Sequence, residues 1–348
     1  MPLSPGQYEN PADIKVGVVG YGGAFNMGKS HLKGMEAAGM TPAAVCEIDP
    51  ERLEVATEDF PGIGTYGSLE EMLADSDVDV ITIITPHNTH ADLAIQCLEA
   101  GRHVVTEKPF AITTDECDAM IAAAEKADVM LSTYHNRHWD GCVLTALQKV
   151  VKEKVIGDIV RIQARMGNYG QPGDWWRTSK SISGGILYDW GVHLLEYGLQ
   201  LIDAPIAEVS GYAHQGHWAD KTRWKDDTNE DEGFLVTRFE TGQWMTLRIT
   251  TVDAWPKEKD FEITGTKGTF AFDQGRWELR LPQEEGLLIQ KGRNQPGEQL
   301  KYYQNVADHL VDGADLVITP EWARRPIHIL DLANRSVEEG VSQKPRYT

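Results

Sequence analysis

The chain has few basic residues for its length, few cysteines and no long apolar run. Its 348 residues include 33 lysines and arginines against 53 aspartates and glutamates, so the formal net charge is −20. Nucleic-acid-binding proteins neutralise phosphates with lysine and arginine, and this charge therefore argues against nucleic acid or an anionic membrane surface as a partner. The hydrophobic content of 41% is that of a globular protein, and the length corresponds to about two domains.

The apolar runs and the cysteines exclude further classes. The longest apolar stretch, around residues 79–85, is far shorter than the roughly 20 residues that cross a bilayer. The first 15 residues lack the charged and apolar regions of a secretory signal. The four cysteines, Cys46, Cys97, Cys117 and Cys142, form no CxxC pair. We expect reduced, buried thiols in a cytoplasmic protein, and a redox or zinc role is the alternative.

The first 136 residues alternate short apolar runs with helical patterns. Continuous apolar runs predict buried strands at residues 15–20, 43–47, 79–85, 103–107 and 129–134. Runs of this kind are typical of a parallel sheet that is covered on both faces. Between them, Ser68 with Glu71 and Thr113 with Glu116 have the spacing of capping boxes at helix starts. The alternation predicts right-handed βαβ units and a doubly wound Rossmann sheet over residues 13–136.

A different pattern begins after residue 136. A helical segment at 141–154 is followed by runs that alternate polar and apolar residues, which predicts half-exposed strands joined by hairpins. These runs lie at residues 160–169, 233–239, 241–250, 260–265, 268–273 and 276–282. Helical patterns near 302–314 and 326–340 end the chain. We therefore predict an α/β protein in which residues 137–348 form an α+β domain with a large, open, mostly antiparallel sheet. The last helix could instead pack back on the first domain.

The first predicted strand runs into a glycine-rich loop. Gly20 and Gly22 begin the GxGxxG pattern, whose glycines allow a tight turn and a close approach of backbone to a pyrophosphate. The third glycine position holds Phe25, so we interpret the loop as lengthened by about three residues, with Gly28 at the helix start. The alternative is that these glycines only make a turn.

An acidic residue stands where a dinucleotide site needs one. Glu47 ends the second predicted strand and can accept hydrogen bonds from the adenosine ribose, while repelling a 2′-phosphate. NAD is therefore favoured over NADP; Asp49 supports this preference and Arg52 argues against it. The residues expected to bind the cofactor are Gly20, Gly22, Gly23, Ala24, Phe25, Asn26, Met27, Glu47, Thr85, Pro86, Asn88, His90, Glu107 and Lys108.

Two further motifs carry candidate catalytic side chains. Lys108 directly follows the predicted strand at residues 103–107, at the edge of the parallel sheet where ligands bind in doubly wound folds, and it can hydrogen-bond a substrate hydroxyl. Asp189 and His193 are four residues apart, so on a helix they share a face, and the carboxylate can position an imidazole that serves as general base. The alternatives are a solvated lysine, a helix-capping aspartate and a core histidine.

In this order the motifs resemble those of the Gfo/Idh/MocA family of NAD(P)-dependent oxidoreductases, which includes glucose–fructose oxidoreductase and inositol dehydrogenases. The motifs are GYGG (20–23), TPHNTH (85–90), AGRHVVTEKP (100–109) and GGILYDWGVH (184–193), and the resemblance covers nearly the whole chain. It implies a Rossmann domain followed by a substrate-binding and oligomerisation domain, whose open sheet assembles dimers or tetramers. It also implies that Lys108, Asp189 and His193 are the catalytic residues.

The expected reaction is hydride transfer between NAD and a secondary alcohol of a sugar, an inositol or a related polyol. His193 takes the hydroxyl proton, Lys108 hydrogen-bonds the same oxygen and Asp189 orients the site. Tryptophans can stack on a sugar ring, and Trp175 is one candidate for this role. Core packing is the alternative for each tryptophan. The other residues expected to bind substrate are Asn136, Arg137, His138, Trp139, Trp176 and Arg177.

Other activities remain open at this point. An NAD-dependent glycosidase that oxidises its sugar transiently is one alternative, and a non-catalytic regulator that senses NAD or sugar is another. We expect no bound metal, because no HExxH or CxxC motif accompanies the three HxxH pairs. These pairs are His87/His90, His135/His138 and His214/His217.

Overall fold

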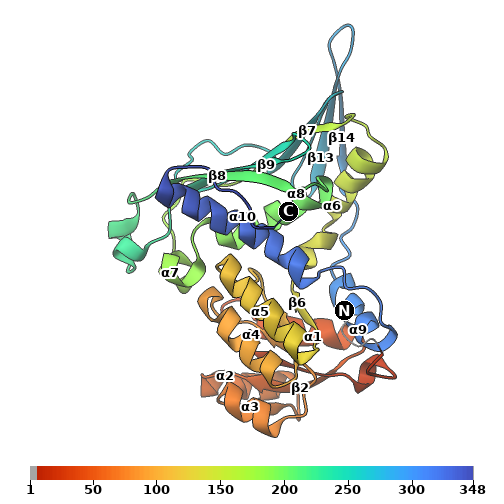
Figure 1. The fold of residues 1–348 in the computed structure, drawn as a ribbon, viewed down its shortest axis with the longest axis vertical. Coiled ribbons are helices and arrows are strands. Elements are labelled where there is room, and N and C mark those ends of the chain that lie inside the picture. Colours follow the sequence, from red (N-terminus) through yellow and green to blue (C-terminus); the bar gives the residue numbers. More distant parts are fainter. Residues whose placement is uncertain (1–5, 348) are drawn as a thin grey trace. The chain divides into compact units, whose positions relative to one another are not determined.

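The computed structural model describes residues 6–347, and residues 1–5, part of the stretch in which we expect no secretory signal, lie outside the described residues. The chain divides into two compact units (Figure 1). The first comprises the chain up to residue 136 together with residues 300–324, and the second comprises residues 137–299 and the chain from residue 325 on. Each unit is considered by itself below.

The first unit contains a six-stranded parallel sheet with the order β3-β2-β1-β4-β5-β6. This is the order of a dinucleotide-binding Rossmann fold, so the predicted doubly wound sheet is confirmed. The strands are β1 (Lys15–Val19), β2 (Thr41–Cys46), β3 (Gly64–Tyr66), β4 (Val80–Ile83), β5 (His103–Thr106) and β6 (Leu131–Thr133). The helices are α1 (Met27–Ala37), α2 (Pro50–Asp59), α3 (Leu69–Asp75), α4 (His90–Glu99), α5 (Thr114–Ala127) and α9 (Lys301–Asp312), with 3-10 turns η1 (Pro11–Asp13) and η2 (His87–Thr89).

Local sequence signals account for the helix starts in this unit. The Ser68 hydroxyl accepts the backbone N–H of Glu71 at the start of α3. At the start of α5, Thr113 and Glu116 form a full capping box in which each side chain accepts a backbone N–H from the other residue. Such caps satisfy N–H groups that have no partner inside the helix, so both predicted helix starts are confirmed.

The second unit is built on an eight-stranded sheet with the order β14-β13-β12-β11-β7-β10-β9-β8. Its neighbours are antiparallel except for β7 and β10, which run parallel, so the predicted mostly antiparallel sheet is confirmed. The strands are β7 (Ile159–Gly167), β8 (Ile206–His214), β9 (Glu232–Phe239), β10 (Trp244–Thr250), β11 (Phe261–Gly265), β12 (Thr269–Phe272), β13 (Arg276–Pro282) and β14 (Leu287–Arg293). The helical segments are α6 (Gly141–Ala146), the π-helix η4 (Leu147–Lys152), α7 (Lys180–Ser183), α8 (Leu187–Leu201) and α10 (Pro320–Glu339), which belongs to this unit from residue 325 on. The 3-10 turns are η3 (Asn136–Trp139), η5 (Trp176–Thr178), η6 (Ala219–Lys221) and η7 (Lys225–Asp227).

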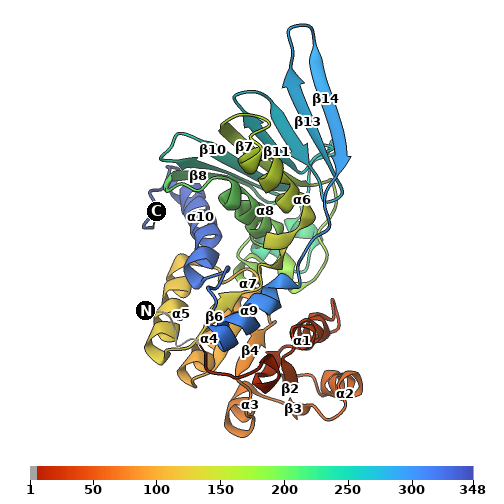
Figure 2. The ribbon, with the colours of Figure 1, turned by 90° about the vertical axis from the view of Figure 1, so that its right-hand side faces the viewer.

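One face of this sheet is covered by helices and the other is open. Gly198 of α8 allows the helix to approach β10, since a Cβ there would lie 2.2 Å from the sulfur of Met245. Side chains along β9 and β10 alternate between buried and more exposed, as expected for a sheet with one covered face. The hairpin of β13 and β14 extends beyond the other strands of the sheet (Figure 2).

The four cysteines are all buried and free. Burial raises the pKa of Cys46 to about 11 and the pKa values of Cys97 and Cys142 to about 12. A thiol reacts as the thiolate, and these three thiols are protonated near neutral pH. The prediction that the four thiols are buried is confirmed.

Candidate functional site

The loop between β1 and α1 depends on glycine at two positions for its own packing. Gly20 has φ 102°, and a Cβ there would lie 2.3 Å from the backbone oxygen of Ile84. A Cβ at Gly28 would lie 2.5 Å from the ring of Tyr21. Gly22, in contrast, is exposed, and no heavy atom lies within 4 Å of where its Cβ would be. The exposed part of the loop therefore leaves room for a ligand, while Gly20 and Gly28 hold it against the sheet.

Charged side chains flank this loop on the side of β2. The Glu47 carboxylate accepts the backbone N–H of Tyr21 at 2.7 Å and that of Asp49 at 3.1 Å. Arg52 donates to the Tyr21 carbonyl at 2.9 Å, and its guanidinium lies beside Gly23. Helix α1 starts after Asn26, whose side chain does not cap it, so the first backbone N–H groups of α1 can bind phosphate. The donor set and the open loop fit a dinucleotide.

The carboxyl ends of β4 and β5 carry the next predicted residues. Glu107 and Lys108 follow β5, and the Lys108–Pro109 peptide bond is cis. His90, at the start of α4, is fully buried, and its ring nitrogens lie 2.8 Å from the Pro109 carbonyl and 3.0 Å from the Thr85 carbonyl. His90 thus connects the two loops and would act on a cofactor through them, whereas Asn88 is exposed.

The glutamate beside the lysine is held by residues that the sequence analysis did not single out. The Glu107 side chain is only 14% exposed, and Oε1 lies 3.0 Å from Nε2 of His31 on α1. Oε2 accepts the backbone N–H of Lys108 at 2.8 Å. Burial alone raises the pKa of Glu107, but the hydrogen bond from His31 and the charges of His31 and Lys108 outweigh it, so the pKa lies below its ordinary value. Glu107 is therefore an ionised anchor for the lysine backbone.

In the second unit, helix α8 carries a stripe of polar side chains. Asp189, His193, Glu196 and Gln200 follow one another at intervals of four, three and four residues, so they share one face of the helix. Glu196 is buried, and its Oε1 lies 2.5 Å from Nδ1 of His138. His138 is a predicted substrate-binding residue, and Glu196 fixes the orientation of its ring.

The predicted substrate residues around Asp189 form a cluster of charges and indoles. Arg177 lies 3.4 Å from the Asp189 carboxylate, and its guanidinium lies 5.1 Å and 5.2 Å from the ring centres of Trp175 and Trp176. Cation–π contacts of this length attract a guanidinium to the ring faces. Arg177 is therefore positioned beside Asp189, and Asp189 precedes His193 by one turn of α8.

A second arginine packs against the same helix. The Arg137 guanidinium lies 4.6 Å from the ring centre of Trp190, which in turn contacts the ring of His193 at 5.7 Å. Arg137 also bonds Asp140 at 2.9 Å. Trp139 is only 8% exposed. This burial is typical of a core residue, which is the alternative role stated above for the tryptophans. Asn136, at the start of η3, is half-buried.

The turn before α8 brings its backbone close to a buried carboxylate. Gly185 has φ 121°, and a Cβ there would lie 2.9 Å from Glu230 Oε2. Glu230 is buried; its carboxylate accepts the backbone N–H of Ile186 at 2.9 Å and pairs with Lys180 at 2.9 Å. Glu230 lies in a charge-dense stretch (residues 221–232), where acidic side chains are usually solvated, yet it is buried against this turn.

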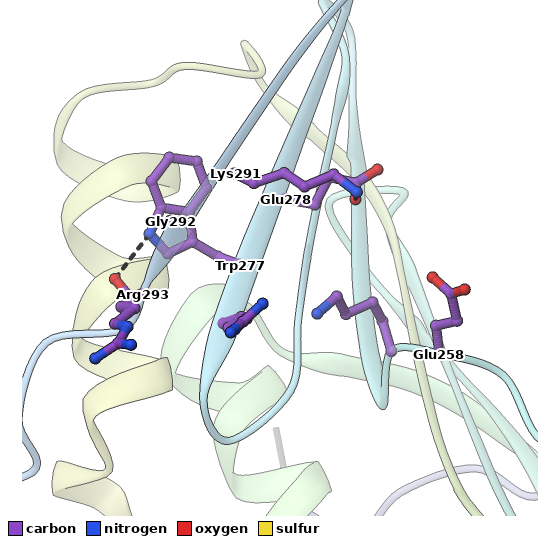
Figure 3. A pocket seen from close by; sticks show the side chains of 8 residues that line it. Glu258, Trp277, Glu278, Lys291, Gly292 and Arg293 are labelled. Carbon is purple, nitrogen blue, oxygen red and sulfur yellow. Dashed lines mark hydrogen bonds and ion pairs between the residues drawn. The ribbon is translucent and has the colours of Figure 1, made fainter.

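Three further features of the described residues bear on function: possible metal-binding groups, membrane-spanning helices and pockets. Within residues 6–347 no group of three or more histidine, cysteine, aspartate or glutamate side chains could hold a metal ion. No helix in the same range is both long and apolar enough to cross a membrane. A pocket of about 400 Å³ lies along β13 and β14 (Figure 3). It is lined by Glu258, Lys259, Arg276, Trp277, Glu278, Lys291, Gly292 and Arg293, none of which is a predicted site residue.

The comparisons with known proteins agree with this geometry. Residues 14–135 match the profile of an oxidoreductase family with an NAD-binding Rossmann fold, and residues 144–271 match the Gfo/Idh/MocA C-terminal domain. The chain belongs to the Gfo/Idh/MocA family. It is 29% identical to scyllo-inositol 2-dehydrogenase (NADP(+)) IolW from Bacillus subtilis strain 168, over 94% of each chain. It is 32% identical to levoglucosan dehydrogenase from Pseudarthrobacter phenanthrenivorans, over 76% of this chain and 74% of the relative.

A solved structure extends the likeness to the fold. A levoglucosan dehydrogenase in complex with NADH and levoglucosan superposes with a TM-score of 0.80 at 21% identity, over 96% of this chain and 99% of that one. This member of the Gfo/Idh/MocA family is therefore an oxidoreductase with an NAD-binding Rossmann domain, and the predicted enzyme class and cofactor are confirmed. None of these three proteins is named as a glycosidase or a regulator.

Proposed function

We propose that this family member oxidises a secondary alcohol of a sugar, an inositol or a related cyclic polyol with NAD. The observation that carries the proposal is Lys108, which stands at the carboxyl end of β5 with its backbone bonded to a buried, ionised glutamate. Doubly wound sheets bind ligands at that edge. The names of the two relatives, an inositol dehydrogenase and a levoglucosan dehydrogenase, support this substrate class.

The proposed roles follow from the chemistry of each side chain. The Lys108 ammonium donates a hydrogen bond to the reacting hydroxyl, and His193 takes the hydroxyl proton as general base. Asp189, held by Arg177, supplies a fixed negative charge on the same helix face as His193 and stabilises the imidazolium that forms. When bound, the nicotinamide accepts the hydride, and the protein supplies positioning and proton transfer.

We further propose that NAD is preferred over NADP. The Glu47 carboxylate lies beside the loop, where it would repel a ribose 2′-phosphate. Arg52 is the opposing consideration, but its Nε is already bonded to the Tyr21 carbonyl. The relative from Bacillus subtilis is named for NADP(+), so the cofactor preference of this chain needs a direct test. Titration of the protein with NAD and with NADP, followed by protein fluorescence, measures the two affinities.

Substitution of Lys108 tests the proposal. Purified protein is screened for NAD reduction with monosaccharides, inositols and anhydrosugars, and Lys108→Met is compared with Lys126→Met, an exposed lysine of α5 in the same unit. Loss of a hydrogen-bond donor to an oxygen that gains negative charge in the transition state lowers turnover about 100-fold or more, so Lys108→Met should lose activity and still bind NADH. Equal turnover of Lys108→Met and the wild type would remove Lys108 from the mechanism.

We also propose that the open sheet of the second unit joins two or more copies of the chain, and that the enzyme works in the cytoplasm. The pocket along β13 and β14 is lined by four basic and two acidic side chains, although the whole chain carries a net charge of −20. A second copy of an acidic chain is a complementary partner for such a surface. A reducing compartment suits the four free thiols.

A further inference from the structure

A row of buried hydrogen bonds connects helix α9, near the C-terminal end of the sequence, to the backbone of the lysine in the proposed active site. His31 is completely buried on α1, between Glu107 and Tyr303 of α9. Its Nε2 lies 3.0 Å from Glu107 Oε1, and its Nδ1 lies 2.5 Å from the Tyr303 hydroxyl. The other oxygen of Glu107 accepts the backbone N–H of Lys108. All four residues belong to the first unit.

The chemistry of these groups determines which atom donates each hydrogen bond. An ionised carboxylate can only accept hydrogen bonds, so Nε2 of His31 carries a hydrogen and donates it to Glu107. The second ring nitrogen is held by the Tyr303 hydroxyl, and burial raises the pKa of Tyr303 well above its ordinary value, so the phenol stays protonated. With both nitrogens engaged, the imidazole cannot rotate without breaking a bond inside the core.

Packing holds Tyr303 in place independently of its hydroxyl. Its ring stacks on Tyr134 at 5.3 Å and meets Tyr302 edge-on at 5.2 Å. Tyr134 also contacts the ring of His31 at 4.4 Å. A Cβ at Gly34 would lie 3.0 Å from the Tyr303 ring. Removal of the hydroxyl alone therefore leaves a filled site, and the effect of the hydrogen bond can be separated from that of the packing.

We propose that His31 and Tyr303 are positioning residues, which hold Glu107 and through it the backbone of Lys108 in the arrangement that hydride transfer requires. The role in catalysis rests on the proposed function of Lys108, whereas the positioning itself is a property of the first unit. A displacement of about 1 Å at a reacting group can cost 100-fold in rate. Weakening this row of hydrogen bonds should therefore lower kcat more than dinucleotide affinity.

The two neighbouring tyrosines of α9 supply a matched pair of variants. Tyr302 is equally buried, but its hydroxyl bonds Ser132 at 2.9 Å rather than His31. Tyr303→Phe and Tyr302→Phe each remove one buried hydroxyl from the same cluster. We expect Tyr303→Phe to lower kcat about tenfold or more. The Kd for NADH should change less than kcat, because most of the expected cofactor contacts lie outside the displaced segment, in the glycine loop and around Glu47 and Thr85. Tyr302→Phe should keep the wild-type kcat.

Amide hydrogen exchange gives a readout that needs neither substrate nor turnover. Peptides that cover residues 104–110 report on the bond between the Lys108 N–H and Glu107. In the cofactor-free protein, Tyr303→Phe should speed exchange there and Tyr302→Phe should not. Equal exchange in both variants and the wild type, or equal loss of kcat in both variants, would overturn the positioning role. Activity of Lys108→Met at the wild-type level, with faster exchange in Tyr303→Phe, would instead refute the proposed function and leave the positioning intact.

A second pair of variants covers the case in which Tyr303→Phe does not fold. Glutamine can place an N–H donor near the position of Nε2, whereas leucine cannot. His31→Gln should therefore keep more of the wild-type kcat, and slower exchange at residues 104–110, than His31→Leu. Equal values for these two variants would overturn the inference.

Discussion

At the residue scale, His103 makes the stability of the first unit depend on pH. Its Nδ1 accepts the backbone N–H of Met130 at 2.9 Å, and its Nε2 lies 3.0 Å from the Gln7 side-chain oxygen, so the structure requires a neutral ring. Burial, with the charge of His309, lowers the pKa of His103 to about 4. The unfolded chain takes up this proton near pH 6.5, so between pH 6.5 and 4 the unfolded state binds more protons and acid reduces stability.

Substitution of this histidine isolates its contribution. His103→Asn keeps an acceptor for Met130 but cannot titrate. The free energy of unfolding of the wild type should fall more steeply than that of His103→Asn between pH 6.5 and 4, by up to about 1 kcal/mol per pH unit. Urea unfolding at several pH values measures the difference. His217→Asn, at an exposed ring, should keep the wild-type slope, and parallel slopes for wild type and His103→Asn would contradict the prediction.

The same scale shows where reasoning from sequence stops. Lys108, Asp189 and His193 are found through their motifs, since each motif lies within about ten residues of chain. Their supporting partners are not. His31 and Tyr303 are 272 positions apart, and no local pattern relates two such positions. Glu230 lies 44 residues after the turn that it anchors, inside a stretch (residues 221–232) whose high charge is typical of exposed residues.

At the element scale, the loop between β1 and α1 has glycines of two kinds, which mutation can separate. Gly20→Ala places a side chain in a left-handed conformation, with its Cβ 2.3 Å from a carbonyl oxygen, and should lower the free energy of unfolding by about 2 kcal/mol or more. Gly22→Ala meets no atom within 4 Å and should leave stability within about 0.5 kcal/mol. However, it should weaken NADH binding if this exposed backbone contacts the pyrophosphate. Thermal unfolding of the cofactor-free protein and NADH titration distinguish the two effects, and equal stabilities would contradict this division of roles.

Elements with a clear apolar pattern or a capping signal were predictable, and strands without such a pattern were not. The buried strands of the parallel sheet and the capped helices α3 and α5 stand where their patterns place them. Strand β3 has three residues and a central exposed side chain, too little for a pattern. Strand β14 consists mostly of exposed residues because it is the last strand of its sheet, so its sequence does not alternate between apolar and polar.

At the scale of the whole chain, the order of segments in the sequence does not reveal which compact unit each segment belongs to. Helix α9 follows the second sheet in the sequence, yet residues 300–324 cluster with the Rossmann unit. Tyr302 and Tyr303 are buried there, and Ser132 of β6 bonds both the Tyr302 hydroxyl and the Ile318 carbonyl. The helix has the amphipathic pattern of many surface helices, and that pattern predicts an apolar contact but not which unit supplies it.

The last prediction concerns self-association through the second sheet. Hairpin β13–β14 exposes Leu287, Leu288 and Ile289 close to the pocket with its excess of basic side chains. Exposed apolar groups on an outer strand invite contact with another chain. Light scattering should therefore give a mass that is a multiple of 38.8 kDa at micromolar concentration, and Ile289→Glu should lower it. Val317→Glu is the matched control, since Val317 in the first unit is 43% exposed against 47% for Ile289, and it should leave the mass unchanged. A carboxylate buried without a partner in an apolar interface costs more free energy than most interfaces can offset. If Ile289→Glu assembles like the wild type, the contact between copies therefore does not involve this hairpin. A monomeric wild type would contradict self-association altogether.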